Sequence, residues 1–186
     1  MTANARTTVA VLADTHGFLD PRIAEHVAEC DYAVHAGDVG GADVLCALRP
    51  RESIVAIRGN NDTAARWAES EAHFLENLPT QARVPLPGGD LVVVHGDDGR
   101  GLKQRHRHLR GSYPEAAAVV YGHSHRLTVD QEAVPWILNP GAAGRTRVYD
   151  GPSCLLMNCS EGEWRVESVQ LPQRRQPKGE SRRRRA

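Results

Sequence analysis

Side chains of the kinds that bind divalent metals stand in five short motifs along the chain. The motifs are DTHG, GDVG, GNND, VHGD and GHSH, and they carry Asp14, His16, Asp38, Asn60, His95, His123 and His125. Imidazole, carboxylate and amide oxygen together suit borderline metals such as Mn, Fe, Ni or Zn better than Ca or Mg. One motif alone would be a weak signal, because GD and HG dipeptides are common. Five motifs in succession predict a metal centre.

Each motif stands at the end of a short apolar segment that must position it. The segments read VAVLAD, YAVHAGD, IVAIRGNND, LVVVHGDD and AAVVYGHSH, and they are rich in β-branched residues. Short runs that are bounded by Gly and lack clean alternation suit strands buried on both faces. Because ligands of open α/β sheets gather at the carboxyl ends of the strands, we expect the five motifs to meet there.

The spacing inside two motifs is suited to chelation. Side chains of an extended segment repeat every two residues. Asp14 and His16 are therefore expected to point the same way, as are His123 and His125. Each pair is predicted to contribute to one metal site.

The remaining segments predict how these strands are connected. Residues 21–29 begin with Pro21 after the N-cap candidate Asp20, and residues 41–48 have helical spacing of apolar side chains, so both are predicted helices. Antiparallel strands are predicted for residues 81–84 with 91–94, 127–131 with 134–138, and 154–159 with 164–169. Residues 63–78 are predicted to be partly helical. A mixed two-sheet sandwich with outer helices, of class α/β (α+β), accommodates these elements better than one parallel sheet.

The formal charge is unevenly distributed along the chain. The 186 residues include 23 basic and 23 acidic ones, but residues 173–186 carry seven basic and one acidic residue and thus a charge of +6. Residues 1–172 carry −6 and are predicted to form one globular domain, followed by a disordered basic tail at 173–186. Because the tail has no aromatic residue for base stacking, it could bind nucleic acid through charge alone.

Composition and cysteine spacing exclude several other classes of protein. With 40% hydrophobic and 25% charged residues, the chain is not collagen-like, a coiled coil or wholly disordered. It has neither a run long enough to span a membrane nor the pattern of a signal peptide, so we expect a cytoplasmic protein without a membrane partner. The four cysteines show no CxxC spacing, and Cys30, Cys46, Cys154 and Cys159 are expected to be buried, reduced thiols.

The five motifs, taken in order, resemble those of the calcineurin-like metallophosphoesterase superfamily. The small size and the NPGA sequence at 139–142 are similar to its compact bacterial and archaeal phosphodiesterase branch, the YfcE-like proteins. The resemblance covers residues 9–171 and implies a four-layer αββα sandwich. It also implies that one metal is held by Asp14, His16 and His125, that a second is held by Asn60, His95 and His123, and that Asp38 bridges both.

The activity that the resemblance implies is hydrolysis of a small phosphoester, most specifically a phosphodiester. Two divalent ions, two ligand carboxylates and a bridging hydroxide sum to about +1, which attracts an anionic substrate. Paired metals orient the hydroxide for in-line attack on phosphorus and stabilise the leaving oxygen. Mn is the first expectation for the metal, with Ni, Fe or Zn as alternatives.

Two departures from the superfamily pattern narrow the expected activity. Many members have His after the Asn of GN, whereas this chain has Asn61, a neutral amide that cannot act as a general acid near pH 7. We therefore expect a preference for phosphodiesters with good leaving groups, with Asp38, Asn61 and Asp62 as catalytic candidates; Asn61 would also contact substrate, and Asp62 would contact substrate or orient Asn61. The sequence GDVGGADVL lacks the Asp-Arg-Gly of protein Ser/Thr phosphatases and dinucleoside-tetraphosphate hydrolases, so these activities are less expected.

Basic residues near the motifs have two interpretations. The stretch 100–110 contains Arg100, Lys103, Arg105, His106, Arg107, His108 and Arg110. It forms either a solvated helix face or an anion-steering surface, and Arg100 and Arg145 are the candidates for substrate binding. His35, inside a predicted strand, is expected to be a packed core histidine.

A noncatalytic scaffold on the same fold, resembling the retromer subunit, is the alternative function. Fold alone cannot choose between a scaffold and an enzyme. Because a scaffold has no reason to hold all seven ligand residues, and none is missing here, the enzyme is favoured. The sequence leaves the natural substrate, the physiological metal and the formation of a homo-oligomer open.

Overall fold

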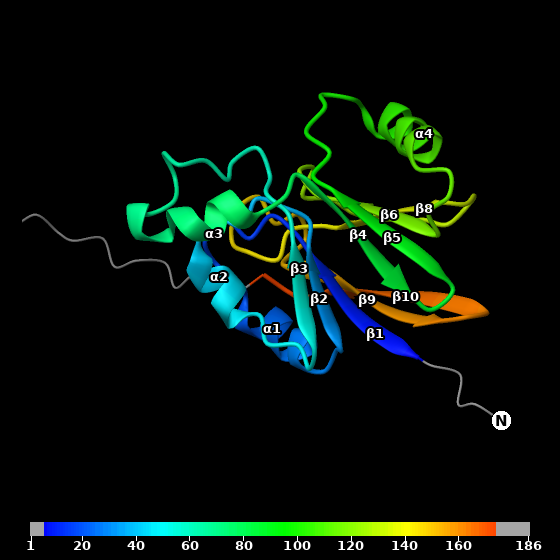
Figure 1. Ribbon diagram of the computed structural model, residues 1–186, viewed down its shortest axis with the longest axis horizontal. Coiled ribbons are helices and arrows are strands. Elements are labelled where there is room, and N and C mark those ends of the chain that lie inside the picture. Colours follow the sequence, from blue (N-terminus) through cyan, green and yellow to red (C-terminus); the bar gives the residue numbers. More distant parts are fainter. Residues whose placement is uncertain (1–5, 174–186) are drawn as a thin grey trace, which may run out of the picture.

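Two mixed β-sheets face each other in the computed structural model, which describes residues 6–173 (Figure 1). The first sheet, of order β10-β9-β1-β2-β3, contains β1 (Thr7–Leu12), β2 (Tyr32–His35), β3 (Ser53–Ala56), β9 (Ser153–Ser160) and β10 (Glu163–Gln170). The second, of order β4-β5-β6-β8-β7, contains β4 (Gln81–Leu86), β5 (Gly89–Val94), β6 (Ala118–Tyr121), β7 (Leu127–Asp130) and β8 (Trp136–Pro140). Strands β1–β2–β3 and β5–β6–β8 are parallel, and the others pair antiparallel, as the three predicted antiparallel pairs require.

Apolar side chains of both sheets form one core between them. Val11 and Val34 of the first sheet share a cluster with Val93 and Val120 of the second, and all four are fully buried. Burying a side chain of this size contributes about 1.5–3 kcal/mol relative to leaving it exposed. The outer faces are covered as well, which is why these strands read as unbroken apolar runs.

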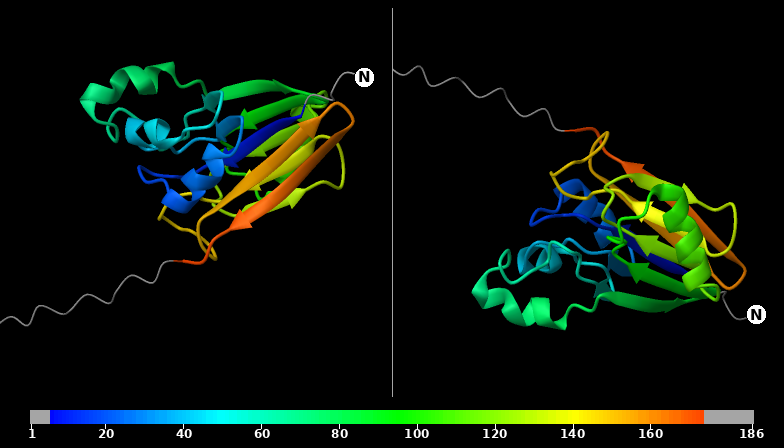
Figure 2. Two further views of the ribbon diagram at one scale, coloured as in Figure 1. Left: turned by 90° about the horizontal axis from the view of Figure 1, so that it is seen from below. Right: turned by 90° about the horizontal axis from the view of Figure 1, so that it is seen from above.

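Helices cover the outer faces and complete four layers in the order αββα, as expected (Figure 2). On the first sheet lie α1 (Pro21–Ala28), α2 (Ala42–Ala47), the 3₁₀ turn η1 (Glu69–Glu71) and α3 (Ala72–Asn77). Ile23, Val44 and Leu75 pack there against the outer face of β1 and β2. Helix α4 (Leu102–Ser112) packs on the second sheet through Leu109.

Local signals account for the first helix. Asp20 is its N-cap, accepting a hydrogen bond from the Arg22 backbone N at 3.0 Å, and Pro21 occupies the first turn. Residues 63–78 are partly helical, as predicted, through η1 and α3.

The prediction of four buried thiols is wrong at one position. Cys30, Cys154 and Cys159 are buried and free, whereas Cys46 is exposed. Cys46 lies two residues after the buried Val44 on α2 and therefore points to the other side of that helix.

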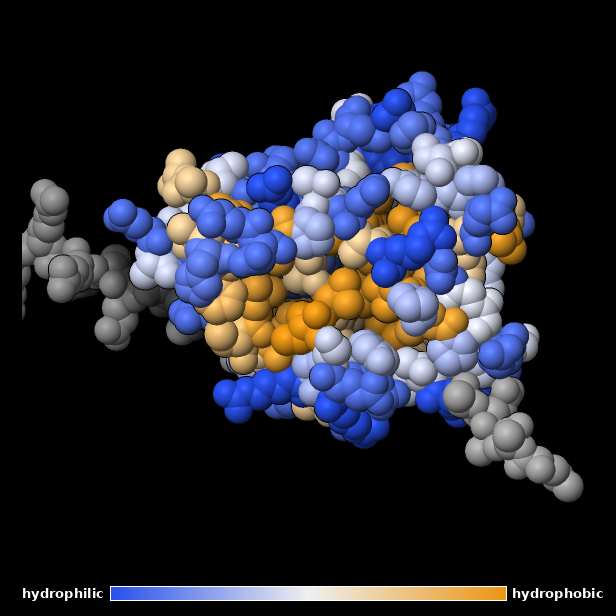
Figure 3. All heavy atoms as spheres, in the orientation of Figure 1, coloured by the Kyte–Doolittle hydropathy of each residue, from blue (hydrophilic) through white to orange (hydrophobic). Residues whose placement is uncertain are grey.

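The surface is polar over α4 and apolar where β3 lies beside β4 (Figure 3). Among the described residues, no helix is long and apolar enough to cross a membrane. The predicted basic tail lies outside the described part of the chain except for Gln173.

Candidate metal centre

The parallel strands of both sheets end at the same edge, and the five motifs meet there. β1 ends at Leu12 and β6 at Tyr121, so neither DTHG nor GHSH is extended. Asp14, His16 and Asp38 have φ of 55°, 48° and 56°, and His123 and His125 have φ of 63° and 57°. This corrects two expectations. The motifs are not extended, and Asp14 and His16 converge from left-handed residues instead of alternating along a strand. His123 and His125 do not contribute to one site, because they fall in different groups of ligand candidates. Left-handed backbone conformations of this kind cost of order 1–3 kcal/mol each and occur where surrounding contacts enforce them.

Backbone hydrogen bonds between the first two loops provide that enforcement. The N–H groups of Asp14 and His16 donate to the carbonyls of Gly37 and Asp38, both at 3.0 Å. Gly59 is needed for close approach, because a Cβ there would lie 2.7 Å from the His95 ring. The glycines of the motifs thus allow the loops to pack directly against the ligand side chains.

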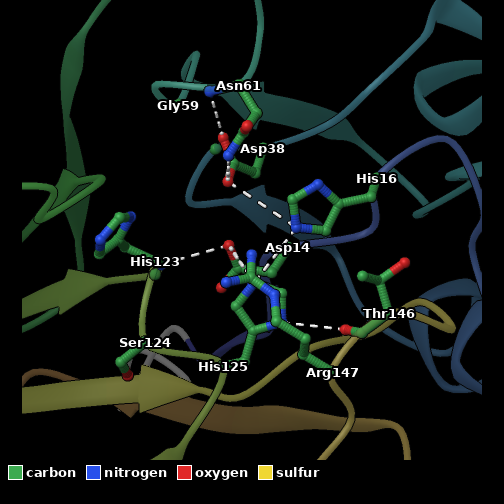
Figure 4. Close-up of polar contacts among 12 residues, drawn as sticks. Asp14, His16, Asp38, Gly59, Asn61, His123, Ser124, His125, Thr146 and Arg147 are labelled. Atoms are coloured by element: carbon green, nitrogen blue, oxygen red, sulfur yellow. Dashed lines mark hydrogen bonds and ion pairs between the residues drawn. The ribbon is translucent and has the colours of Figure 1, made fainter.

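The first group of ligand candidates contains Asp14, His16, Asp38 and His125, with ligand atoms all within 4.8 Å of one another. Nε2 of His16 lies 3.1 Å from Nε2 of His125 and 3.8 Å from Oδ2 of Asp38. Oδ1 of Asp14 lies 3.5 Å from Nε2 of His125. Figure 4 shows these side chains pointing toward one another from the DTHG, GDVG and GHSH loops.

The second group contains Asp38, His95 and His123, again within 4.8 Å. Oδ1 of Asp38 lies 3.4 Å from Nε2 of His95. Oδ1 of Asn60 lies 3.0 Å from that same nitrogen and 3.1 Å from Nδ1 of His123. The two Asp38 oxygens therefore face different groups.

The buried ligand candidates include a carboxylate oxygen without a hydrogen-bond partner, which fits a site for a metal ion. Oδ2 of Asp14 is one of the few buried side-chain atoms in the described chain without a hydrogen-bond partner. Burial raises the pKa of Asp14 to about 7. Although burial alone would raise it, contacts with His95 and Asn61 hold the pKa of Asp38 below its usual range. An unpaired carboxylate oxygen beside imidazole nitrogens is the environment that a divalent cation satisfies.

The histidines are held in tautomers that expose the nitrogen needed for a metal. Nδ1 of His95 lies 2.9 Å from the Ala36 carbonyl, and Nδ1 of His125 lies 3.0 Å from the Thr146 carbonyl. Because a carbonyl only accepts, both Nδ1 atoms carry a proton, and Nε2 is the nitrogen of each ring that faces the cluster. Burial, assisted by the charge of Arg147, lowers the pKa of His125 to about 4, which favours the neutral ring.

His35 is a core histidine, as expected. Its Nδ1 accepts from the Gly37 N–H at 3.2 Å, so Nε2 carries the proton and donates to Thr15 Oγ1 at 2.9 Å. Burial lowers the pKa of His35 to about 4. The ring is neutral and connects β2 to the DTHG loop.

Asn61 and Asp62 contact different parts of the site. Asn61 donates from its backbone N and from Nδ2 to the two oxygens of Asp38, at 2.8 and 2.7 Å. The buried Asp62 carboxylate accepts from three backbone amides, those of Val39, Gly40 and Gly59, and from Nε1 of Trp67, at 2.8–3.0 Å. Asp62 therefore joins the GDVG and GNND loops and orders the segment that carries Asn61.

The two arginines predicted to bind substrate are placed outside the ligand cluster. Arg100 pairs with Asp98 at 2.7 Å, and the Arg145 guanidinium lies 3.3 Å from the centroid of the Phe18 ring. Neither forms a hydrogen bond or an ion pair with a ligand candidate, and both roles stay predictions.

Helix α4 leaves Lys103, Arg107 and His108 exposed, so the steering role stays a prediction, but it holds other basic side chains inside the fold. Arg105 and His106 are buried. Nδ1 of His106 lies 2.6 Å from Asp130 Oδ2, and Arg110 contacts the other oxygen of Asp130 at 2.6 Å. Two basic side chains of α4 thus attach the helix to β7, because both contact the Asp130 carboxylate.

Arg147 is a site residue that the sequence reasoning missed. Its Nη2 lies 3.0 Å from Nε2 of His125. The sequence signal available was its place shortly after NPGA, which drew attention to Arg145 instead. Beside the second group there is also a cavity of about 450 Å³, whose walls include Asn60, His95 and Tyr113.

Comparisons with known proteins agree with this geometry. A model of the calcineurin-like phosphoesterase superfamily domain matches residues 8–162. A probable metallophosphoesterase of Methanocaldococcus jannaschii is 27% identical over 143 residues, which are 72% of this chain and 67% of that protein. Another, of Methanothermobacter thermautotrophicus, is 23% identical over 155 residues, which are 80% of this chain and 84% of that protein.

Solved structures share the fold at low identity. Vacuolar Protein Sorting 29 from Cryptosporidium parvum superposes with a TM-score of 0.68 at 17% identity, covering 90% of this chain and 99% of that one. An archaeal phosphodiesterase superposes with a TM-score of 0.64 at 18% identity, covering 87% and 99%. These likenesses concern the fold, while the family model spans most of the sequence and includes all five motifs. The chain belongs to the calcineurin-like phosphoesterase superfamily.

Proposed function

We propose that this chain is a binuclear metal-dependent phosphoesterase that hydrolyses phosphodiesters. The observation that carries the proposal is the position of Asp38, whose two oxygens face two separate groups of ligand candidates. Asp14, His16 and His125 would complete one metal site, and Asn60, His95 and His123 the other. Mixed nitrogen and oxygen donors favour a borderline metal, with Mn as first expectation and Ni, Fe or Zn as alternatives.

The residues of the chain divide the work of such a reaction. When bound, the metal ions would supply a nucleophile of lowered pKa and positive charge for the phosphoryl oxygens. Asn61 fixes the Asp38 carboxylate through two hydrogen bonds, and Asp62 positions the loops on which both stand. Since Asn61 cannot donate a proton as an acid, the leaving group receives no proton from this position, which favours aryl diesters over alkyl monoesters.

A noncatalytic scaffold is a second candidate, because Vacuolar Protein Sorting 29 proteins share this fold. The complete donor set and the partnerless oxygen of Asp14 favour the enzyme over the scaffold. A scaffold would also predict no turnover in the presence of any metal.

The test combines metal stoichiometry with turnover. Metal-free protein is titrated with Mn²⁺ by calorimetry and assayed with bis-(4-nitrophenyl) phosphate, alongside Asp38→Asn and the control Asp90→Asn. Asp90 pairs with Arg83 at the amino end of β5, away from the loops of the site. We expect two ions per chain and diester turnover for the wild type and the control, and loss of both tight sites and turnover for Asp38→Asn. Unchanged turnover after Asp38→Asn would refute the shared-ligand role.

A further inference from the structure

We propose that Arg147 is an anion subsite of the metal centre, which binds the phosphoryl oxygens of the substrate or of inorganic phosphate. This inference rests on the proposed function and names the residue that recognises the anion. It follows from the contacts of one imidazole ring, that of His125, with two consecutive residues of the loop between β8 and β9.

The hydrogen-bonding directions around His125 are determined. Thr146 offers a carbonyl to Nδ1, so this nitrogen must donate, and Nε2 is left with a lone pair. Nη2 of Arg147 lies 3.0 Å from Nε2, and a guanidinium can only donate. Arg147 therefore directs an N–H at the same lone pair that the first metal site would need.

The loop holds this arrangement through several contacts of its backbone. Arg147 itself is left-handed, with φ 51°, which turns its side chain over the site (Figure 4). The carbonyls of Val148 and Tyr149 accept from Gln173 and Gln170 at 2.9 and 3.1 Å. Because these hydrogen bonds hold the two residues that follow Arg147, they help to maintain its left-handed backbone conformation.

The charge of Arg147 reaches several ligand candidates. Burial has the largest effect on the pKa of His125, His16 and Asp14, and the positive charge of Arg147 is a smaller influence that lowers all three. Other arginines of this region are held by aromatic rings: Arg145 lies over Phe18, and Arg126 lies 4.6 Å from the centroid of Tyr149. Arg147 is thus the arginine of this loop whose guanidinium is directed at the ligand cluster.

One lone pair cannot serve both a guanidinium and a metal ion. When Nε2 of His125 binds a metal ion, the N–H groups of Arg147 need another hydrogen-bond acceptor close to the same position. A phosphoryl group offers two oxygens with the spacing that a guanidinium binds in bidentate fashion. Metal loading should therefore convert Arg147 from a partner of His125 into a partner of the anion.

The experiment measures phosphate and metal binding, independently of turnover. Arg147→Gln and Arg147→Lys are compared with the control Arg126→Gln, which removes the same charge from a neighbouring side chain held on Tyr149. Calorimetric titration of the Mn²⁺-loaded proteins with inorganic phosphate should show about 10–100-fold weaker binding for Arg147→Gln, from losing charge-assisted hydrogen bonds of about 1.5–3 kcal/mol. Arg147→Lys should fall between it and the wild type, and Arg126→Gln should bind like the wild type.

A second titration addresses the competition for His125. Mn²⁺ should bind the metal-free Arg147→Gln protein at least as tightly as the wild type, because a competing donor is gone. Weaker metal binding by this variant, or equal losses of phosphate affinity in Arg147→Gln and Arg126→Gln, would overturn the inference. If the wild type binds phosphate and turns over diesters while Arg147→Gln binds phosphate equally well, only the subsite fails. If the wild type itself binds no metal and turns over nothing, the proposed function fails.

Discussion

Replacing Asp62 by Asn should destabilise the fold, because four donors converge on this one carboxylate. Oδ2 accepts from the amides of Val39 and Gly59, and Oδ1 from Gly40 and the Trp67 indole. An asparagine offers one carbonyl oxygen, and its NH₂ would face two N–H groups. Losing two hydrogen bonds to a charged acceptor, each worth about 1.5–3 kcal/mol, lowers the free energy of unfolding by about 3–6 kcal/mol.

Thermal unfolding in the presence of a chelator measures this loss directly. For a chain of this length, 1 kcal/mol shifts Tm by roughly 2–4 °C, so Asp62→Asn should unfold roughly 6–24 °C below the wild type. Asp90→Asn removes only the exposed pair with Arg83, worth about 0–1 kcal/mol, and is the control. A Tm within about 2 °C of the wild type, combined with lost turnover, would refute the positioning role and place Asp62 at the substrate.

Three further predictions concern other parts of the molecule. Asp130→Asn should lower the free energy of unfolding by about 1–3 kcal/mol, by weakening the contacts to His106 and Arg110. Although partial burial would raise it, those contacts lower the pKa of Asp130. The stabilisation by Asp130 is therefore present above the usual carboxyl range and is lost as the pH falls through the lowered pKa. Urea unfolding of the wild type and Asp130→Asn between pH 7 and pH 3 should show the difference in their unfolding free energies shrinking. Asn61→His should raise the ratio of alkyl to aryl phosphodiester turnover, by at most about 10²–10⁴-fold, and an unchanged ratio would mean that leaving-group protonation is not limiting. Asp14→Asn should weaken Mn²⁺ binding by calorimetry but leave the metal-free protein at least as resistant to urea, because the partnerless buried carboxylate oxygen is replaced by a neutral amide; a strong loss of stability in chelator would contradict this.

The fold was largely predictable because its signals are local. The apolar runs at Val11, Val34, Val93 and Val120 became the central strands, since they are buried from both sides. The N-cap Asp20 began α1 as expected. The seven ligand candidates converge because parallel strands of both sheets end at one edge.

Other features depend on tertiary contacts that no residue pattern encodes. The left-handed backbones of Asp14 and His123 are held by hydrogen bonds between loops, so the expectation of extended motifs is wrong. The burial of Arg105 and His106 follows from the approach of α4 to Asp98 and Asp130. Arg147 reaches His125 only because a loop between two strands of different sheets folds back over the site.

The central claim is that two metal ions share Asp38. Anomalous diffraction from crystals of the Mn²⁺-loaded protein tests it most directly, since it locates the ions themselves. The account predicts two peaks about 3.5–4 Å apart, one on each side of the Asp38 carboxylate. A single peak, or two peaks of which Asp38 contacts only one, would contradict it.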